Sequence, residues 1–262
     1  MFKKLIWAGI ACFYSGSAMA ASGEFTLEYR VQWGNSFLGR SIANWVIDEQ
    51  SYRLTGTAIS EGALSFFYDF EGENELTGII SNGTYQPSRF ASDSTYNDDG
   101  YVTEVIWRKD NPRPSYTVTP EPELDEVHPL DPDSLDNVLD PFSAMLTALA
   151  AFEKTNSCQG EYRIFDGRRR SDVTLVDLGT TTLEADRTWS YQGKATICGS
   201  ASKMLGGHEI KEDKDKEEEP DFEKVKIYVA EVASGLTMPV RIEIDNFLGD
   251  VIIRLNMRDS KI

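Results

Sequence analysis

The fold is decided by the stretch Phe25-Thr26-Leu27-Glu28-Tyr29-Arg30-Val31-Gln32-Trp33. Apolar side chains stand at every second position of this stretch, which is the pattern of a strand buried on one face. Gly34-Asn35-Ser36 offers a turn directly afterwards, and a second strand is expected from Leu38 to Ile47. Strands joined by so short a turn pair in the antiparallel sense. The region therefore predicts the start of an antiparallel meander.

The same rhythm of strands and tight turns continues along most of the chain. Asn82-Gly83, Asp99-Gly100 and Asp166-Gly167 are residue pairs typical of such turns. Further strands are expected at Tyr52–Ser60, Ser65–Glu73, Leu76–Ser81, Ser88–Tyr96, Tyr101–Lys109, Gly160–Phe165, Ser171–Leu178, Thr188–Cys198, Val225–Val232, Pro239–Asn246 and Gly249–Met257. A flat open sheet of about a dozen strands would expose long edges. We therefore expect a mainly β fold, either a strongly curved antiparallel sheet or an incomplete β-barrel, with a β-sandwich as the alternative.

Two segments without apolar periodicity interrupt this rhythm. Residues 111–132 contain six prolines, which predicts a loop that crosses the surface or an edge of the sheet. Residues 211–224 are all charged apart from Pro220 and Phe222, and such a tract is expected to form a solvated surface loop. Residues 21–262 are otherwise expected to form a single all-β domain.

One helix is expected within this domain, over residues 140–153. Asp140 can cap it, and Pro141 suits its first turn. Apolar residues then recur at helical spacing, at Phe142, Met145, Leu146, Leu149 and Phe152. We expect this stripe to pack on the sheet; the alternative is a movable lid over a cavity.

The first twenty residues have the pattern of a cleavable signal peptide. Two lysines precede an apolar run from Leu5 to Tyr14, and Ala18-Met19-Ala20 offers the small residues that signal peptidase requires. The expected location is therefore periplasmic. The alternative is a lipoprotein in which Cys12 is lipidated, although Gly9 stands where such sites usually carry leucine. No later stretch reaches the roughly 18 apolar residues of a membrane helix, so we do not expect an integral membrane protein.

The net charge of −17 argues against a general nucleic-acid or anionic-membrane binder, because both need a basic face. Removal of the leader with its two lysines would make the charge −19. Such acidity favours solubility, with cation binding or docking to a basic partner as alternatives. Cys158 and Cys198 would remain, and an even pair in an oxidising compartment predicts a disulfide. Their spacing matches neither a redox motif nor a zinc site.

Several short motifs resemble one bacterial family. They are Tyr29-Arg30-Val31-Gln32-Trp33 with Leu38-Gly39, Asp140-Pro141-Phe142-Ser143-Ala144, Phe165-Asp166-Gly167-Arg168-Arg169, and Tyr191-Gln192-Gly193, together with Cys158 and Cys198. In this order they resemble the exported proteins of domain of unknown function 3108. The resemblance covers nearly the whole mature chain and implies an envelope location, a mostly β fold and the disulfide. It implies no activity and no catalytic residues.

The most concentrated positive charge is Arg168-Arg169-Arg170. Three guanidinium groups near a hairpin are candidates for binding a phosphate, sulfate or carboxylate. The alternative is that they pair with local acids such as Asp172 or Glu161. His128 and His208 lie in no recognised nucleophile motif, so no catalytic residue is assigned.

An acidic run is weighed as a calcium loop. Asp131, Asp133 and Asp136 have part of the spacing, but the glycine and terminal glutamate of an EF-hand are missing. We therefore expect neither a metal nor a cofactor. The question of enzymatic activity stays open, with a non-enzyme favoured.

The aromatic residues expected on strands belong either to the core or to a ligand cleft. They are Trp33, Trp45, Phe66, Phe67, Tyr68, Phe70, Trp107 and Trp189. Three functions are considered. The first is a non-enzymatic binding or carrier protein for a lipid, glycan or other cell-envelope ligand. The second is an envelope-assembly or structural factor that acts through a protein partner, and the third is a glycan hydrolase that uses two carboxylates.

Overall fold

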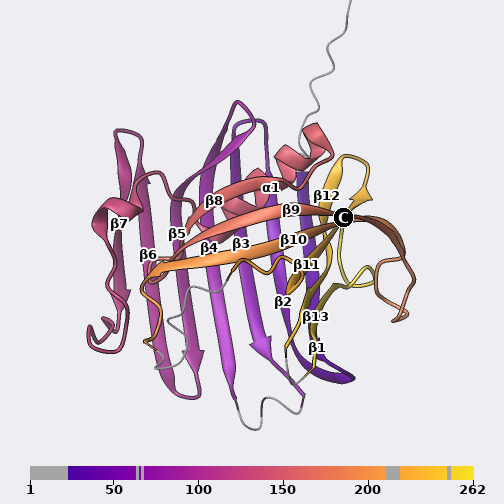
Figure 1. Ribbon diagram of the computed structural model, residues 1–262, viewed down its shortest axis with the longest axis horizontal. Helices are drawn as coiled ribbons and strands as arrows, with labels where there is room; N and C mark the ends of the chain where they lie inside the picture. Colours follow the sequence, from indigo (N-terminus) through magenta and orange to yellow (C-terminus); the bar gives the residue numbers. More distant parts are fainter. Residues whose placement is uncertain (1–22, 63–64, 66–67, 211–218, 247–248) are drawn as a thin grey trace, which may run out of the picture.

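The computed structural model describes residues 23–62, 65, 68–210, 219–246 and 249–262. Within them, thirteen strands form one antiparallel sheet around one α-helix, α1, Pro141–Thr155 (Figure 1). The strands are β1 Gly23–Trp33, β2 Ser36–Ile47, β3 Ser51–Ser60, β4 Phe70–Ser81, β5 Thr84–Tyr96, β6 Asp99–Arg108, β7 Asn111–Thr119, β8 Gly160–Phe165, β9 Arg170–Leu183, β10 Gly193–Gly206, β11 Val225–Ala233, β12 Leu236–Ile244 and β13 Val251–Leu255. No helix of the described chain is both long and apolar enough to cross a bilayer.

Two meanders make up the sheet. Across it the strand order is β7-β6-β5-β4-β3-β2-β1-β13-β12-β11-β10-β9-β8. Strand β13 pairs with β1 on one side and with β12 on the other, so it joins the two meanders into one surface. Helix α1 contacts β5, β12 and β8, which lie far apart in that order, so the sheet must curl around the helix. In Figure 1, β8, β9 and β10 cross in front of β3–β6. The expected strongly curved antiparallel sheet is thereby confirmed.

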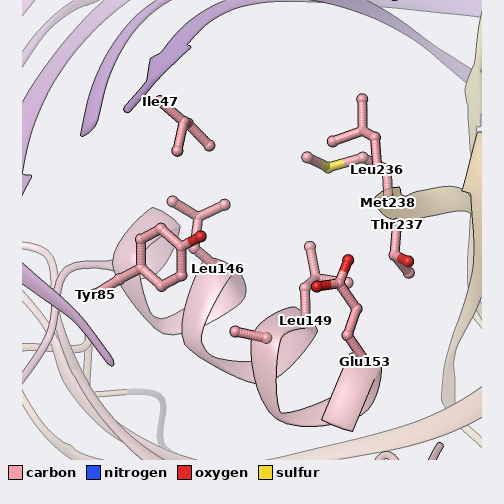
Figure 2. A pocket seen from close by; sticks show the side chains of 9 residues that line it. Ile47, Tyr85, Leu146, Leu149, Glu153, Leu236, Thr237 and Met238 are labelled. Carbon is pink, nitrogen blue, oxygen red and sulfur yellow. The ribbon is translucent and has the colours of Figure 1, made fainter. Parts of the chain in front are cut away.

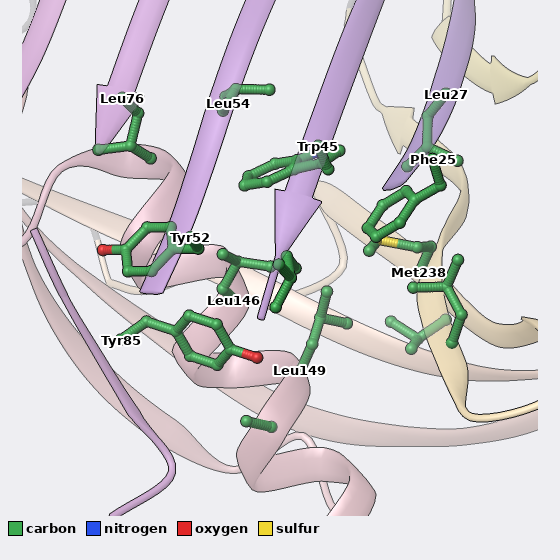
Figure 3. Close-up of a cluster of buried hydrophobic side chains, with 14 of the residues drawn as sticks. Phe25, Leu27, Trp45, Tyr52, Leu54, Leu76, Tyr85, Leu146, Leu149 and Met238 are labelled. Carbon is green, nitrogen blue, oxygen red and sulfur yellow. The ribbon is translucent and has the colours of Figure 1, made fainter. Parts of the chain in front are cut away.

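Helix α1 fills one end of the space inside the curve. Its Leu146 and Leu149 face Trp45, Tyr52 and other buried side chains of the sheet, as Figure 3 shows. The buried inner residues of the sheet at this end include Phe25, Leu27, Trp45, Ile47, Tyr52, Leu54, Leu76, Tyr85, Phe90, Met238, Val240 and Leu255. The helix therefore packs on the sheet, as its apolar stripe predicts, and forms the centre of the hydrophobic core.

Local hydrogen bonds fix both ends of α1. The buried carboxylate of Asp140 accepts from the backbone N–H groups of Phe142 and Ser143 and from the Ser143 hydroxyl. The Tyr52 hydroxyl, 2.6 Å from Ser143 Oγ, ties this cap to β3. Burial raises the pKa of Asp140. At the other end Asn156 takes a left-handed conformation and donates its N–H to Phe152 O, which ends the helix.

The expectation of a loop over residues 111–132 is wrong in its first part, because residues 111–119 form β7. Pro112 and Pro114 are tolerated there because β7 is an edge strand. Proline lacks the backbone N–H donor, and on the open side of an edge strand no neighbouring strand requires that donor. The expected break between Leu76 and the preceding strand is also wrong. Strand β4 runs unbroken because its alternating glutamates point to solvent and leave small residues on the inner face.

Other expectations fall wholly or partly outside the described residues. The signal peptide 1–20, with Cys12, lies outside them, as do Phe66 and Phe67. Of the charged loop 211–224, only residues 219–224 are described.

Strands β7 and β8 are the two edges of the sheet and share no ladder. The segment before α1 lies between them. On one side Asn137 N–H donates to Pro112 O, and on the other Leu139 forms a parallel bridge with Ile164 of β8. Tyr116 of β7 meets Phe165 of β8 edge to face, with ring centroids 5.0 Å apart. We call this junction the seam.

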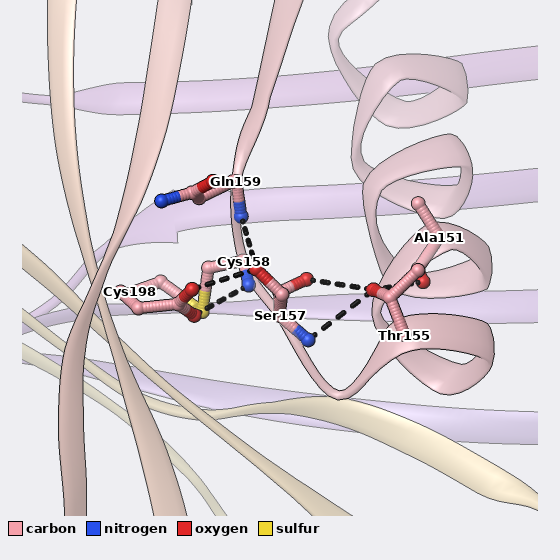
Figure 4. The surroundings of a disulfide bond; sticks show 7 residues. Ala151, Thr155, Ser157, Cys158, Gln159 and Cys198 are labelled. Carbon is pink, nitrogen blue, oxygen red and sulfur yellow. Dashed lines mark hydrogen bonds between the residues drawn. A yellow bond between two sulfur atoms is a disulfide. The ribbon is translucent and has the colours of Figure 1, made fainter.

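The disulfide Cys158–Cys198 fastens the region after α1 to β10 (Figure 4). It links residues 40 positions apart whose Cα atoms are 5.6 Å apart, and both cysteines are buried. Asp177 of β9 accepts the Cys158 N–H at 2.7 Å and the Ser157 hydroxyl at 2.6 Å. The expected disulfide is confirmed, and it holds the last turn of α1 close to the sheet.

Replacing either cysteine should lower stability by the same amount. Cys158→Ser and Cys198→Ser each remove one cross-link, which the chain-entropy model values at roughly 3–4 kcal/mol for a loop of this size. The double variant should be no less stable than either single variant. Urea unfolding of all three proteins measures this, and additive losses would contradict a shared bond.

Candidate functional site

Two rows of apolar side chains cross the inner face of β1, β13, β12 and β11, away from α1. Residues directly opposite each other in antiparallel strands point to the same face. The strand pairing therefore aligns Val31-Ile253-Ile242-Ile227 in one row and Trp33-Val251-Ile244-Val225 in the next. They share the face of Leu27 and Leu255 because they lie an even number of residues away along β1 and β13. We call these eight residues the inner ladder.

The described chain covers the inner ladder less completely than it covers the rest of this face. Near α1 the inner residues are buried, whereas the aliphatic ladder residues are half-buried and Trp33 is 43% exposed. Ile227 packs against the core cluster, and the other ladder residues lie outside that cluster as the described residues define it. Several apolar side chains on neighbouring strands are therefore partly open to solvent.

The helix end of the interior is nearly full. A cavity of about 20 Å³ there has room for about one water molecule. Figure 2 shows Tyr85, Leu146 and Leu149 around it, with Met238 on the facing strand. Glu153 lies at its border, and burial raises the pKa of that carboxyl. The inner ladder, unlike this cavity, offers partly exposed apolar side chains on four neighbouring strands.

Small side chains line the inner face of β2–β5 beside the inner ladder. One row continues from Tyr29 through Ser41, Ala58, Gly72 and Ser94. A second row runs Ala43-Gly56-Asn74-Ser92. A Cβ added at Gly56 would meet only ordinary contacts at 3.7 Å or more. At Gly72 the ring of Phe70 already fills this place, because a Cβ there would lie 2.9 Å from Phe70 Cζ. Around Gly56 the small residues leave space over the sheet, and the two rows carry hydroxyl and amide groups.

Aromatic rings stand where the first of these rows ends. The ring of Tyr96 lies 4.8 Å from that of Phe70 and 5.6 Å from those of Tyr68 and Tyr101, between centroids. Phe70 and Tyr96 are directly paired, and Tyr101 is paired with Ser94, so these three rings lie on the inner face. Tyr68 is 42% exposed. We call these four residues the aromatic cluster.

The three arginines of the predicted anion site do not converge. Arg168 reaches across the seam and donates to the carbonyls of Thr119 at 2.8 Å and Pro120 at 3.1 Å, with weaker bonds to Val102 O and Thr103 Oγ1. Its guanidinium also lies 5.3 Å from the centre of the Tyr101 ring.

The other two arginines point elsewhere. Arg169 is exposed, whereas Arg170 is buried, donates to Ser134 O and pairs with Asp172 at 2.6 Å. Gly167 permits the close approach at the seam, because its φ is +93° and a Cβ there would lie 2.1 Å from Thr103 Cγ2.

The other polar candidates also serve local structure. Asp133 and Asp136, from the acidic run, pair with Arg113 of β7 at 2.8 and 2.9 Å. The rings of His128 and His208 stack at 4.2 Å where two connections meet. No group of three potential metal ligands is found in the described part of the chain.

Sequence reasoning missed a row of arginines on the outer face. Strand pairing places Arg40, Arg30, Arg254 and Arg241 side by side across β2, β1, β13 and β12. Like charges in such positions repel unless acids intervene. Asp186 forms ion pairs with two of these arginines, Arg241 at 3.2 Å and Arg254. In the sequence, each of these arginines stands at a polar position of an alternating strand. That they lie side by side follows only from the strand register.

The model of the family described as "Protein of unknown function (DUF3108)" matches residues 28–256. The chain belongs to the DUF3108 family. This confirms the resemblance seen in the sequence motifs. No curated protein matches this DUF3108 chain.

The DUF3108 chain also resembles a solved structure, the crystal structure of a beta-barrel-like protein of domain of unknown function DUF1849 from Brucella abortus. The TM-score is 0.54 at 11% sequence identity, over 90% of this chain and 97% of that chain. At this identity the likeness concerns the fold alone. It agrees with a barrel-like sheet whose edges are not joined by a ladder.

Asp186→Asn should destabilise the protein in a pH-dependent way. Burial alone would raise the pKa of Asp186, but the bond from Arg254 and the charges of Arg254 and Arg241 lower it below its ordinary value of 3.8. The ionised form therefore stabilises the fold above about pH 4, and this contribution is lost as the pH falls through the lowered pKa.

The variant should lose about 1–3 kcal/mol at pH 7, because Arg254 is buried and keeps only neutral partners. The difference from wild type should shrink below pH 4. Urea unfolding from pH 2.5 to 7 measures this, with exposed Asp93→Asn as the control. A difference that stays constant across this range would count against the pairing.

Arg168→Ala should loosen the seam, because it removes donors to carbonyls on two strands. We expect a loss of about 1–2 kcal/mol and faster amide exchange in β7 and in the turn at residues 166–169. The neighbouring exposed Arg169→Ala is the matched control and should change stability by less than about 0.5 kcal/mol. Equal effects of the two variants in hydrogen-exchange mass spectrometry would contradict the bridging role of Arg168.

Proposed function

We propose that this DUF3108 protein is a non-enzymatic periplasmic binding protein that holds the apolar part of a cell-envelope ligand on the inner ladder. The leader-like residues 1–20 support the periplasmic location. The observation that carries the proposal is the partial exposure of neighbouring apolar residues on one side of a concave sheet. Contiguous exposed apolar surface of this kind marks binding sites in soluble proteins.

The arrangement of the inner face favours a ligand over a closed core. Ile253 and Ile242 are directly paired and half-buried, so an acyl chain lying along them would remove both from water. Each fully buried methylene contributes about 0.8 kcal/mol. The small residues around Gly56 on β2–β4 leave room beside such a chain.

The alternative of a factor that acts through a protein partner draws on a different observation. Helix α1 fills the other half of the interior, so the core there is solid. The exposed ladder could then be covered by a protein segment in place of a lipid. The binding experiment below separates these alternatives, because a protein partner does not require affinity for small apolar molecules.

An uncharged fluorescent apolar probe, N-phenyl-1-naphthylamine, tests the proposal. It should bind the wild-type protein, and Ile242→Ser and Ile253→Ser should each weaken binding by about fivefold, because each removes part of the apolar contact. Ile79→Ser is the matched control, since Ile79 is 46% exposed on β4 and points to the outer face. Absence of probe binding, or equal effects of all three variants, would refute the ligand site.

A further inference from the structure

The inner face changes chemistry from the inner ladder to the aromatic cluster. The ladder is aliphatic apart from Trp33, and the rows beside it carry the hydroxyls of Ser41, Ser92 and Ser94 and the amide of Asn74. Strands lie about 4.8 Å apart, so β5 lies about 19 Å from β1 along the sheet. A ligand that spans this face therefore meets apolar groups first and then neutral hydrogen-bonding groups and aromatic rings.

The aromatic cluster offers exposed ring surface. Tyr68 is 42% exposed, and Tyr96 and Tyr101 are partly exposed, with their rings turned edge to face. Aromatic rings of this kind combine a large apolar area with a polar hydroxyl group. A sugar ring has the matching composition, because its C–H faces are apolar and its rim carries hydroxyls.

The charges around the cluster favour a neutral head group. The residues of the rows between ladder and cluster are all uncharged. The exposed acid Asp99 is directly paired with Tyr96 and would repel an anionic head group. Arg168 is the cation beside Tyr101, but its guanidinium already donates to two strand-end carbonyls at 2.8 and 3.1 Å. Binding a phosphate would require breaking these bonds, whereas a sugar would leave them in place.

We propose that the aromatic cluster is a sugar-binding subsite and that the ligand is a neutral glycolipid whose acyl chain lies on the inner ladder. This inference rests on the proposed function, because it needs the ladder to hold the chain. The sugar would stack on Tyr68 and Tyr96. The hydroxyl of Ser94, paired with Tyr101, is available to bond its rim.

Isothermal titration calorimetry with three probes tests the subsite and the ladder separately. The probes are n-dodecyl-β-maltoside and hexaethylene glycol monododecyl ether, both below their critical micelle concentrations, and maltose. The ether has the same chain and an uncharged head group without a sugar ring. We expect the maltoside to bind about tenfold more tightly than the ether, and maltose to bind more weakly than the maltoside. Equal affinity for the two dodecyl compounds would overturn the sugar subsite and leave the proposed function standing.

Variants show whether the cluster is responsible. Tyr68→Ala and Tyr96→Ala should each weaken maltoside binding about three- to tenfold and leave binding of the dodecyl ether unchanged. Tyr96→Phe keeps the ring and should bind the maltoside within twofold of wild type. Tyr116→Ala is the control, because Tyr116 is similarly exposed, at 39%, and lies outside the cluster.

Two further outcomes would overturn the sugar subsite or the ladder. If the alanine variants weaken both dodecyl compounds alike, the cluster is not a sugar subsite. If neither dodecyl compound binds, or if maltose binds as tightly as the maltoside, the ladder holds no chain and the proposed function fails.

Discussion

The packing of α1 against the inner face of the sheet is the contact on which the rest of the structure depends. A helix of 15 residues is about 22 Å long, whereas a strand of 12 residues such as β2 spans about 40 Å. One helix therefore cannot cover an inner face of this size. The end that it covers becomes the core, and the end that it leaves contains the inner ladder. The position of the candidate site thus follows from the length of α1, which is too short to cover the whole inner face of the sheet.

The alternation of apolar residues placed most strands correctly because it depends only on local geometry. It began two of them too early, since β4 starts at Phe70 and not at Ser65, and β10 starts at Gly193 and not at Thr188. The disulfide followed from the cysteine count and the expected compartment, and α1 followed from its cap and stripe. Strand β7 was missed because its prolines signal a loop unless the strand is known to be an edge, and only the tertiary structure makes it one. The inner ladder could not be told from core, because Val31 and Leu27 have the same pattern in sequence and differ only in what covers them. Arg168 likewise belongs to the seam through partners about 50 to 65 residues away.

Side chains bond to backbone groups and charges that strand pairing leaves without a partner. At the seam, guanidinium groups satisfy carbonyls that no neighbouring strand reaches, and buried Arg170 pairs with Asp172. On the outer face, acids separate arginines that the strand register brings together. Arginine therefore serves structure at the seam and on the outer face of this acidic protein. The uncharged rows on the inner face of β2–β5 contrast with both regions.

The edge position of β7 also bears on how the molecule behaves at high concentration. An open sheet edge is a template on which further chains can add strands and grow into aggregates. Pro112 and Pro114 remove two donors from β7, and Asn137 and Arg168 already occupy carbonyls near its two ends. Only a short middle part of the strand is left to accept a new neighbour. The sheet can thus stay unclosed without offering a long edge for polymerisation.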